Sequence, residues 1–141
     1  MKKKRFVQIF LILLCIVMLS STPAYATEAR ASEQITLSSV NLTRKSDGDL
    51  NLYYMVQGTG TMDVIGANKV EIQRNTITGW VTEYTFNSDE YPEMLTTNSS
   101  RYSATVTYTP LFPSKNYRAV VMVYAENYLG STTVKMISKT V

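Results

Sequence analysis

The sequence predicts an all-β protein, a single antiparallel β-sandwich of seven short strands. Beyond residue 33, apolar residues alternate with polar residues in short runs, which is the periodicity of half-buried strands. Gly, Asn, Asp, Ser and Pro separate these runs at a spacing typical of sandwiches. No stretch has the apolar spacing of a long helix, and the sequence contains no internal repeat.

The first two strands are expected at residues 34–43 and 49–57. In the first, Ile35 with Leu37 and Val40 with Leu42 form two apolar pairs that fall out of step across residues 38–39, which indicates a β-bulge there. Residues 46–49 supply the turn between the strands. In the second strand the residues on one face are Leu50, Leu52, Tyr54 and Val56.

The next two strands follow a glycine-containing segment. Residues 58–68 are expected to be a long connection, after which residues 69–75 alternate as a strand. The turn at residues 76–79 leads into a strand at residues 80–86. Trp80, Tyr84 and Phe86 are expected to share the inward face of that strand.

One long loop precedes the last three strands, and two shorter connections separate them. Residues 87–100 are polar and acidic around Pro92, so we expect an irregular, mobile loop. Residues 101–109 alternate strictly, with one buried and one solvated face. Residues 117–126 are apolar on both faces, as in a central strand, and residues 131–141 form the final strand.

The N-terminus has the features of a secretory signal peptide. Residues 2–5 are Lys or Arg, residues 6–19 are apolar, and Ala24-Tyr25-Ala26 is a small-x-small cleavage site. The sequence therefore predicts a secreted, extracellular protein that is cleaved after Ala26 and retains no stable membrane span.

The remaining chain divides into a flexible lead at residues 27–33 and one β-sandwich domain at residues 34–141. Four of the 14 Lys and Arg lie in the predicted signal peptide, so the exported chain has a net charge of about −1. Its cations are scattered along the chain, which argues against nucleic acid as a partner.

Residues 111–117, Leu-Phe-Pro-Ser-Lys-Asn-Tyr, resemble the entry to strand F of fibronectin type III and related immunoglobulin-like domains. The resemblance implies a single seven-stranded immunoglobulin-like (fibronectin type III-like) antiparallel β-sandwich. Tyr117 would then be a tyrosine corner, with its ring in the core and its hydroxyl bonded to backbone near residues 111–114. The core Trp usual in the second strand of that family is absent, and Leu52 or Tyr54 stands there.

Residues 58–67, Gly-Thr-Gly-Thr-Met-Asp-Val-Ile-Gly-Ala, are similar to a family of small exported proteins of Gram-positive bacteria. That resemblance implies an extracellular β-sandwich of unknown function. It implies no catalytic or ligand residues, and an immunoglobulin-like fold by itself carries no particular activity.

Several kinds of chemistry are excluded by residue type. The sequence has no His, and its single Cys, Cys15, lies in the predicted signal peptide, so Ser-His-Asp triads and the usual zinc sites are excluded. No cofactor is expected. Carboxylates remain, namely Asp47 with Asp49, and Asp89, Glu90 and Glu93, all among turn residues where solvated loops are the expected role. Asp47, Asp49 and Asn51 also begin like a calcium loop, but Leu52 and Gly58 stand where its Gly and Glu are required, so a tight turn is expected there and a non-helical calcium site is the alternative.

A binding role is the first functional hypothesis. We expect a secreted, non-enzymatic module that binds a cell-surface or extracellular partner, protein or glycan, through the segments 58–68 and 87–100. The candidate contact residues are Met62, Asp63, Tyr91 and Tyr128. The alternatives are a small carboxylate-based glycan hydrolase, which would need two acids in one pocket, and a passive surface component that pairs through edge strands.

Overall fold

The structure, a computed structural model, describes residues 34–141. The predicted signal peptide at residues 1–26 and the predicted lead at residues 27–33 lie outside the described residues. The described part is all-β, with six strands and one short 3-10 helix, η1. Within it there is no helix long and apolar enough to span a membrane.

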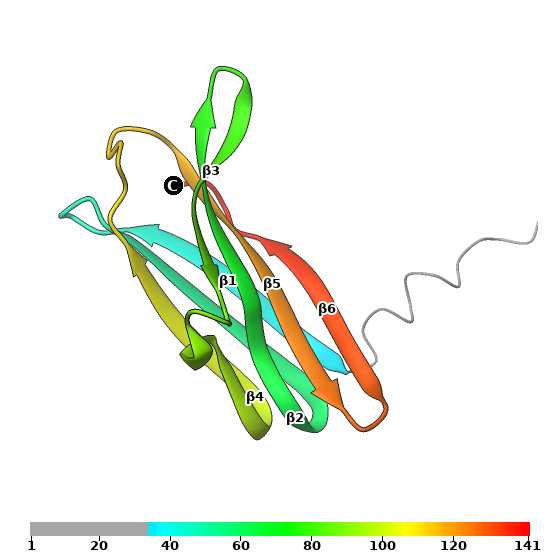
Figure 1. The fold of residues 1–141 in the computed structure, drawn as a ribbon. Coiled ribbons are helices and arrows are strands. Elements are labelled where there is room, and N and C mark those ends of the chain that lie inside the picture. The colour runs from blue at the N-terminus through cyan, green and yellow to red at the C-terminus, as the bar shows by residue number, and fades with distance from the viewer. Residues whose placement is uncertain (1–33) are drawn as a thin grey trace, which may run out of the picture. The chain divides into compact units, whose positions relative to one another are not determined.

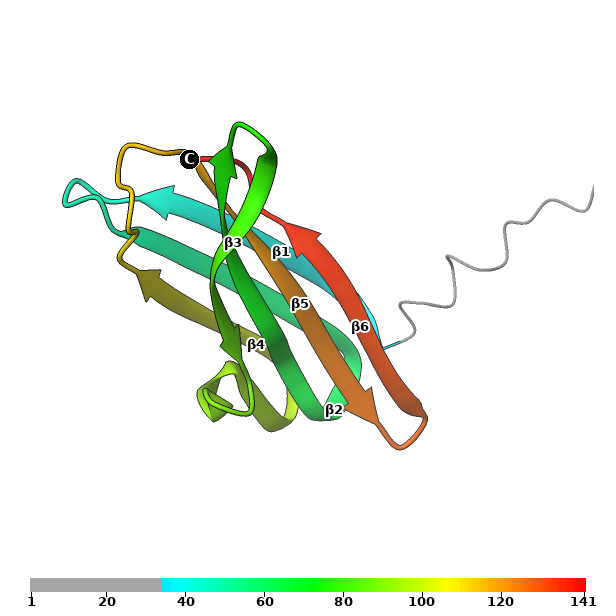
Figure 2. The same cartoon turned by 45° about the horizontal axis from the view of Figure 1, so that its top comes forward.

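The six strands form one antiparallel sheet that folds over itself (Figure 1, Figure 2). The strands follow the order β1-β2-β5-β6, and β3 and β4 each pair with β2 off this path. In chain order the elements are β1 (Ile35–Arg44), β2 (Leu50–Thr76), β3 (Gly79–Asn87), η1 (Pro92–Met94), β4 (Leu95–Tyr108), β5 (Tyr117–Asn127) and β6 (Gly130–Ile137).

β2 organises the sheet because it pairs with four other strands. Its first part, residues 50–57, lies between β1 and β4. Its last part, residues 69–76, pairs with β3 on one side and with β5 on the other. The expectation of a connection at residues 58–68 is therefore wrong. These residues remain in the strand, with an irregularity in the pairing with β4 between Gln57 and Met62, so the structure has six strands rather than seven.

The core lies between the two parts of the folded sheet. One cluster contains the inward residues of both the first part of β2 and β5, and each is at most 1% exposed. Full burial of one such Val or Leu side chain contributes about 1.5–3 kcal/mol, so this alternation is the main source of stability. The predicted alternation is confirmed for Leu50, Leu52, Tyr54 and Val56 in β2 and for Ala119, Val121, Val123 and Ala125 in β5.

β1 departs from the predicted pattern near its start. Its pairing with β2 shifts between Ile35 and Leu37, and not at residues 38–39 as expected. An extra residue in one strand reverses the alternation of faces on either side of it. Ile35 is therefore buried, whereas Leu37 is 50% exposed.

β3 contains a second irregularity, which corrects the expectation for its aromatic residues. Tyr84 pairs with Ile72 and Thr82 pairs with Gln73, so Glu83 between them has no partner in β2. The extra residue separates the faces of Trp80 and Tyr84, which were expected to coincide. Phe86 packs against the core, but Trp80 instead lies beneath the guanidinium of Arg118, 4.4 Å from its ring centroid, and Tyr84 is 38% exposed.

The segment at residues 87–100 is more regular than expected. η1 occupies Pro92–Met94, and β4 already begins at Leu95, so the predicted strand at residues 101–109 starts earlier. The Met94 carbonyl oxygen lies 2.2 Å from the place that a Cβ on Gly66 would occupy, and Gly66 has a φ of +152°. Only Gly fits there, so this close approach fixes η1 against β2.

Candidate functional site

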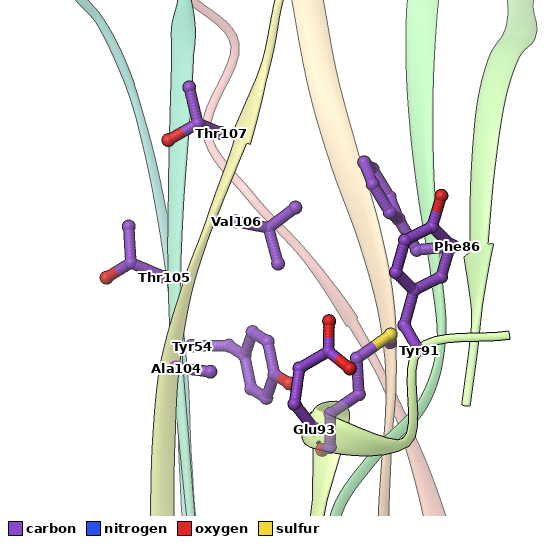
Figure 3. Close-up of a pocket in the computed structure, with 9 residues that line it drawn as sticks. Tyr54, Phe86, Tyr91, Glu93, Ala104, Thr105, Val106 and Thr107 are labelled. Carbon is purple, nitrogen blue, oxygen red and sulfur yellow. Dashed lines mark hydrogen bonds between the residues drawn. The ribbon is translucent and has the colours of Figure 1, made fainter.

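A cleft of about 240 Å³ lies between β3 and β4, with η1 at one end. Phe86 comes from β3, Tyr54 from β2, and the segment that contains η1 supplies three further residues. Figure 3 shows side chains from these elements around a common space, with the Glu93 carboxylate directed into it. The nine lining residues are Tyr54, Phe86, Tyr91, Glu93, Met94, Ala104, Thr105, Val106 and Thr107. We call this feature the tyrosine cleft.

Aromatic rings form the walls of the tyrosine cleft. The Phe86 and Tyr91 ring centroids are 5.2 Å apart, with their planes at 65°, so the two rings make a corner. Tyr84 extends the group: it packs edge-to-face on Phe86 at 4.7 Å and stacks on Tyr108 at 5.6 Å. Such pairs add about 0.5–1.5 kcal/mol each beyond the area they bury, so the wall is a packed unit.

The hydroxyl groups of the tyrosines in and around the cleft form hydrogen bonds within the protein. Tyr54 donates to the Met94 carbonyl oxygen at 3.2 Å, and Tyr102 donates to the Glu93 carbonyl oxygen. The Tyr84 and Tyr91 hydroxyls bond each other at 2.9 Å. Burial raises the pKa of Tyr54, and the nearby Tyr102 and Glu93 raise it further. The walls therefore present ring surfaces rather than free donors to the cleft.

A buried carboxylate lies next to this aromatic group. The unpaired position in β3 belongs to Glu83, whose side chain is 5% exposed and forms an ion pair with Arg74 at 2.8 Å. It also accepts hydrogen bonds from the Tyr108 hydroxyl at 3.0 Å and from the Leu111 backbone N–H at 2.9 Å. The Tyr117 hydroxyl lies 2.9 Å and 3.0 Å from its two oxygens. We call this arrangement the Glu83 cluster.

The hydrogen bonds decide the charge of Glu83. Burial alone would raise the pKa of its carboxyl group. Donors from Leu111, Tyr117, Tyr108 and Arg74 outweigh burial, so the pKa of Glu83 lies below its ordinary value. A carboxylate held ionised in this way is a poor general acid at neutral pH, and its four partners indicate a structural role.

Tyr117 lies where the tyrosine corner was expected, with one difference. Its ring is fully buried, and its hydroxyl accepts a hydrogen bond from the Phe112 backbone N–H at 3.3 Å, within the expected residues 111–114. The hydroxyl proton, however, goes to Glu83. The Tyr117 hydroxyl therefore joins backbone and carboxylate, and the sequence did not predict the bond to the carboxylate.

Of the four candidate contact residues, the structure brings only Tyr91 into the cleft. Met62 is 1% exposed and belongs to the core, while the neighbouring Asp63 is exposed. Tyr128 is 89% exposed in the turn between β5 and β6. The four residues do not form one contact surface.

The other acidic candidates are spread over the described chain. Asp47 accepts the Asp49 backbone N–H at 3.0 Å within the turn, as expected of a local backbone bond. Asp89, Glu90 and Glu93 are all exposed, and Glu93 is the single acid among the nine residues that line the tyrosine cleft. Residues 34–141 hold no group of three or more acids able to bind a metal ion.

Sequence reasoning missed the contributions of Tyr54, Phe86 and Glu93 to the cleft. The alternation of apolar and polar residues places Tyr54 and Phe86 on buried strand faces. Glu93 lies in a polar segment that the sequence predicts to be a loop. Their proximity depends on pairings between residues far apart in the chain. Comparisons of this chain with family models, with curated proteins and with solved structures found no match.

Proposed function

We propose that the protein is a secreted, non-enzymatic binding module whose ligand site is the tyrosine cleft. Its fold would be the immunoglobulin-like sandwich that the sequence predicts. If the two parts of β2 are counted separately, seven strands result, with β1, residues 50–57 and β4 in one layer and the rest in the other. The buried ring of Tyr117 and its bond to Phe112 support the resemblance to fibronectin type III domains.

One observation carries the binding role: the tyrosine cleft is apolar, concave and built by three strands together with η1. Ligand sites in proteins are typically clefts with aromatic walls and a few polar groups, and this cleft has one carboxylate, Glu93, among aromatic rings. Export, which residues 1–26 predict, would place the ligand outside the cell.

The distribution of acids favours binding over glycan hydrolysis. A carboxylate-based hydrolase needs two acids facing one another across its substrate. Glu93 is alone among the lining residues, and Glu83 is occupied by its own cluster. These positions support a binding module rather than the hydrolase.

The proposal is tested with a library of small neutral, cationic and anionic fragments and amide NMR spectra of the purified protein. We expect a subset of fragments to shift the resonances of Phe86, Tyr91 and Val106. Tyr91→Ala, which removes a wall of the cleft, should abolish these shifts. Tyr128→Ala, which removes an exposed ring from the turn between β5 and β6, is the matched control and should leave them unchanged. A library in which no fragment perturbs the cleft would refute the proposed site.

A further inference from the structure

We infer that the ligand of the tyrosine cleft carries an organic cation, an alkylammonium group, which binds between the aromatic rings and Glu93. This inference rests on the proposed function, because it concerns the same cleft. It follows from the chemistry of the walls, from the charge of the lining and from the volume of the cleft.

The walls offer the surfaces that attract cations. The faces of aromatic rings are electron-rich, and a cation within about 6 Å of a ring centroid is attracted to them. Phe86 and Tyr91 meet at 65°, so a compact group placed in their corner contacts two rings. A flat guanidinium group prefers to stack on a single face, whereas a tetrahedral ammonium group suits a corner.

Glu93 supplies the complementary charge. It is the only charged residue among the nine that line the cleft, where no Lys or Arg is present. Among residues 34–141, no side chain or backbone N–H donates a hydrogen bond to its carboxylate, and the bond from Tyr102 goes to its backbone carbonyl. The carboxylate therefore keeps its acceptor capacity for a ligand.

Three arginines of the described chain lie over rings outside the cleft. In the described part of the chain, Arg74 lies 4.1 Å from the ring centroid of Phe112, and Arg118 lies 4.4 Å from that of Trp80. Arg44 lies over Tyr117. Among the described residues no Lys or Arg lies over the rings of Tyr54, Phe86 or Tyr91, so no cation of the protein competes for the ring surface that lines the cleft.

The volume of the cleft matches a small head group. An engineered cavity of about 150 Å³ holds one benzene molecule. The tyrosine cleft, at about 240 Å³, is larger than that and smaller than the ~300–1,000 Å³ of sites for drug-sized ligands. A butylammonium group fits this range, and it can belong either to a free amine or to a lysine side chain of a protein.

The test uses three probes of equal chain length: n-butylammonium, n-butanol and n-butyrate. Amide NMR titration of the purified protein should show n-butylammonium shifting Phe86, Tyr91 and Glu93, with a dissociation constant on the order of millimolar. n-Butanol should bind about tenfold more weakly, and n-butyrate should not shift these resonances. Raising the salt concentration should weaken the binding of the cation only.

Two variants separate the charge from the rings. Glu93→Gln should weaken n-butylammonium by up to about fivefold, the range of an exposed ion pair, whereas Glu90→Gln, the matched control on another exposed acid, should not change it. Phe86→Leu keeps an apolar wall but removes a ring, so it should weaken the cation and leave n-butanol unchanged. Dispersed amide spectra of each variant establish that it is folded.

The outcomes distinguish this inference from the proposed function. If n-butanol or n-butyrate shifts the cleft as strongly as n-butylammonium, the cationic ligand is refuted and the cleft remains a binding site. If no probe or library fragment shifts it, both proposals fail. N-acetyl-lysine methylamide identifies the source: tighter binding than n-butylammonium indicates a lysine of a protein partner, and equal binding indicates a free amine.

Discussion

Replacing Glu83 by Gln should destabilise the fold by about 2–4 kcal/mol at pH 7. Gln has nearly the same shape, but its amide nitrogen cannot accept hydrogen bonds and its charge is zero. The substitution therefore removes the ion pair with Arg74 and weakens the bonds from Tyr108 and Tyr117.

The magnitude follows from the exposure of the two charged partners. Removing one member of a fully buried ion pair costs about 3–5 kcal/mol, because the other charge is left unpaired. The Arg74 side chain is 22% exposed, so water can solvate its guanidinium in part once Glu83 is lost. A single hydrogen bond to a charged group contributes about 1.5–3 kcal/mol, and the expected range lies between these limits.

The effect should also depend on pH in a fixed direction. The pKa of Glu83 is lower in the folded protein than its ordinary value of about 4.3 in an unfolded chain. Its stabilisation is therefore fully present above that ordinary pKa and is lost as the pH falls through the folded pKa. The difference between the parent and Glu83→Gln should be constant near neutrality and shrink below about pH 4.

Urea unfolding, followed by the fluorescence of the single Trp, measures both effects. Glu90→Gln, which removes an exposed charge, is the matched control and should change the free energy of unfolding by less than about 0.5 kcal/mol. A Glu83→Gln variant as stable as this control at pH 7 would refute the structural role of the Glu83 cluster.

Three further predictions concern other parts of the chain. Tyr117→Phe should destabilise by about 1–3 kcal/mol in urea unfolding, since Glu83 and the Phe112 N–H lose a partner; an unchanged midpoint would contradict the tyrosine corner. Gly66→Ala should cost more than about 3 kcal/mol, because its Cβ would collide with backbone near Met94, whereas Gly60→Ala, with open space around it, should be tolerated; equal melting temperatures would contradict this. N-terminal sequencing of exported protein should begin at residue 27, and an intact N-terminus would contradict the predicted cleavage.

The strands with regular alternation could be predicted from the sequence. Residues on alternate positions of a strand face opposite sides of the sheet, so the runs around Leu52 and Val121 identify both the strand and its buried face. This local rule holds wherever pairing is regular, as it is in β5 and the first part of β2.

Elsewhere the rule failed for two physical reasons. Residues 58–68 contain three glycines, which predict a loop, yet pairing with strands far along the chain keeps this segment extended. The extra residues in β1 and β3 have no signature in composition. These extra residues turn Leu37 and Trp80 to the opposite face of the sheet. The two-residue alternation of a strand does not reveal where an extra residue is inserted.

The candidate site was less predictable than the fold. Tyr91 could be singled out from the sequence as a tyrosine left over in a loop, and the structure places it in the cleft. The residues next to Tyr91 in the cleft are brought there by tertiary contacts. The Tyr54 hydroxyl, for example, donates to the carbonyl oxygen of Met94, which lies forty positions later in the sequence. The hydrogen bond from Tyr117 to Glu83 likewise requires the irregularity in β3.

The pairing of β2 with four strands has a consequence for how the protein folds. A cut within residues 58–61 would leave β1 and residues 50–57 on one fragment and β3, β4, β5 and β6 on the other, so residues 50–57 would lose their covalent link to β4 and neither fragment would retain the whole core. The described domain should therefore unfold in one cooperative transition, without a stable intermediate. Because β2 must find partners distant in sequence, its folding should take milliseconds to seconds, the range of proteins dominated by nonlocal pairing.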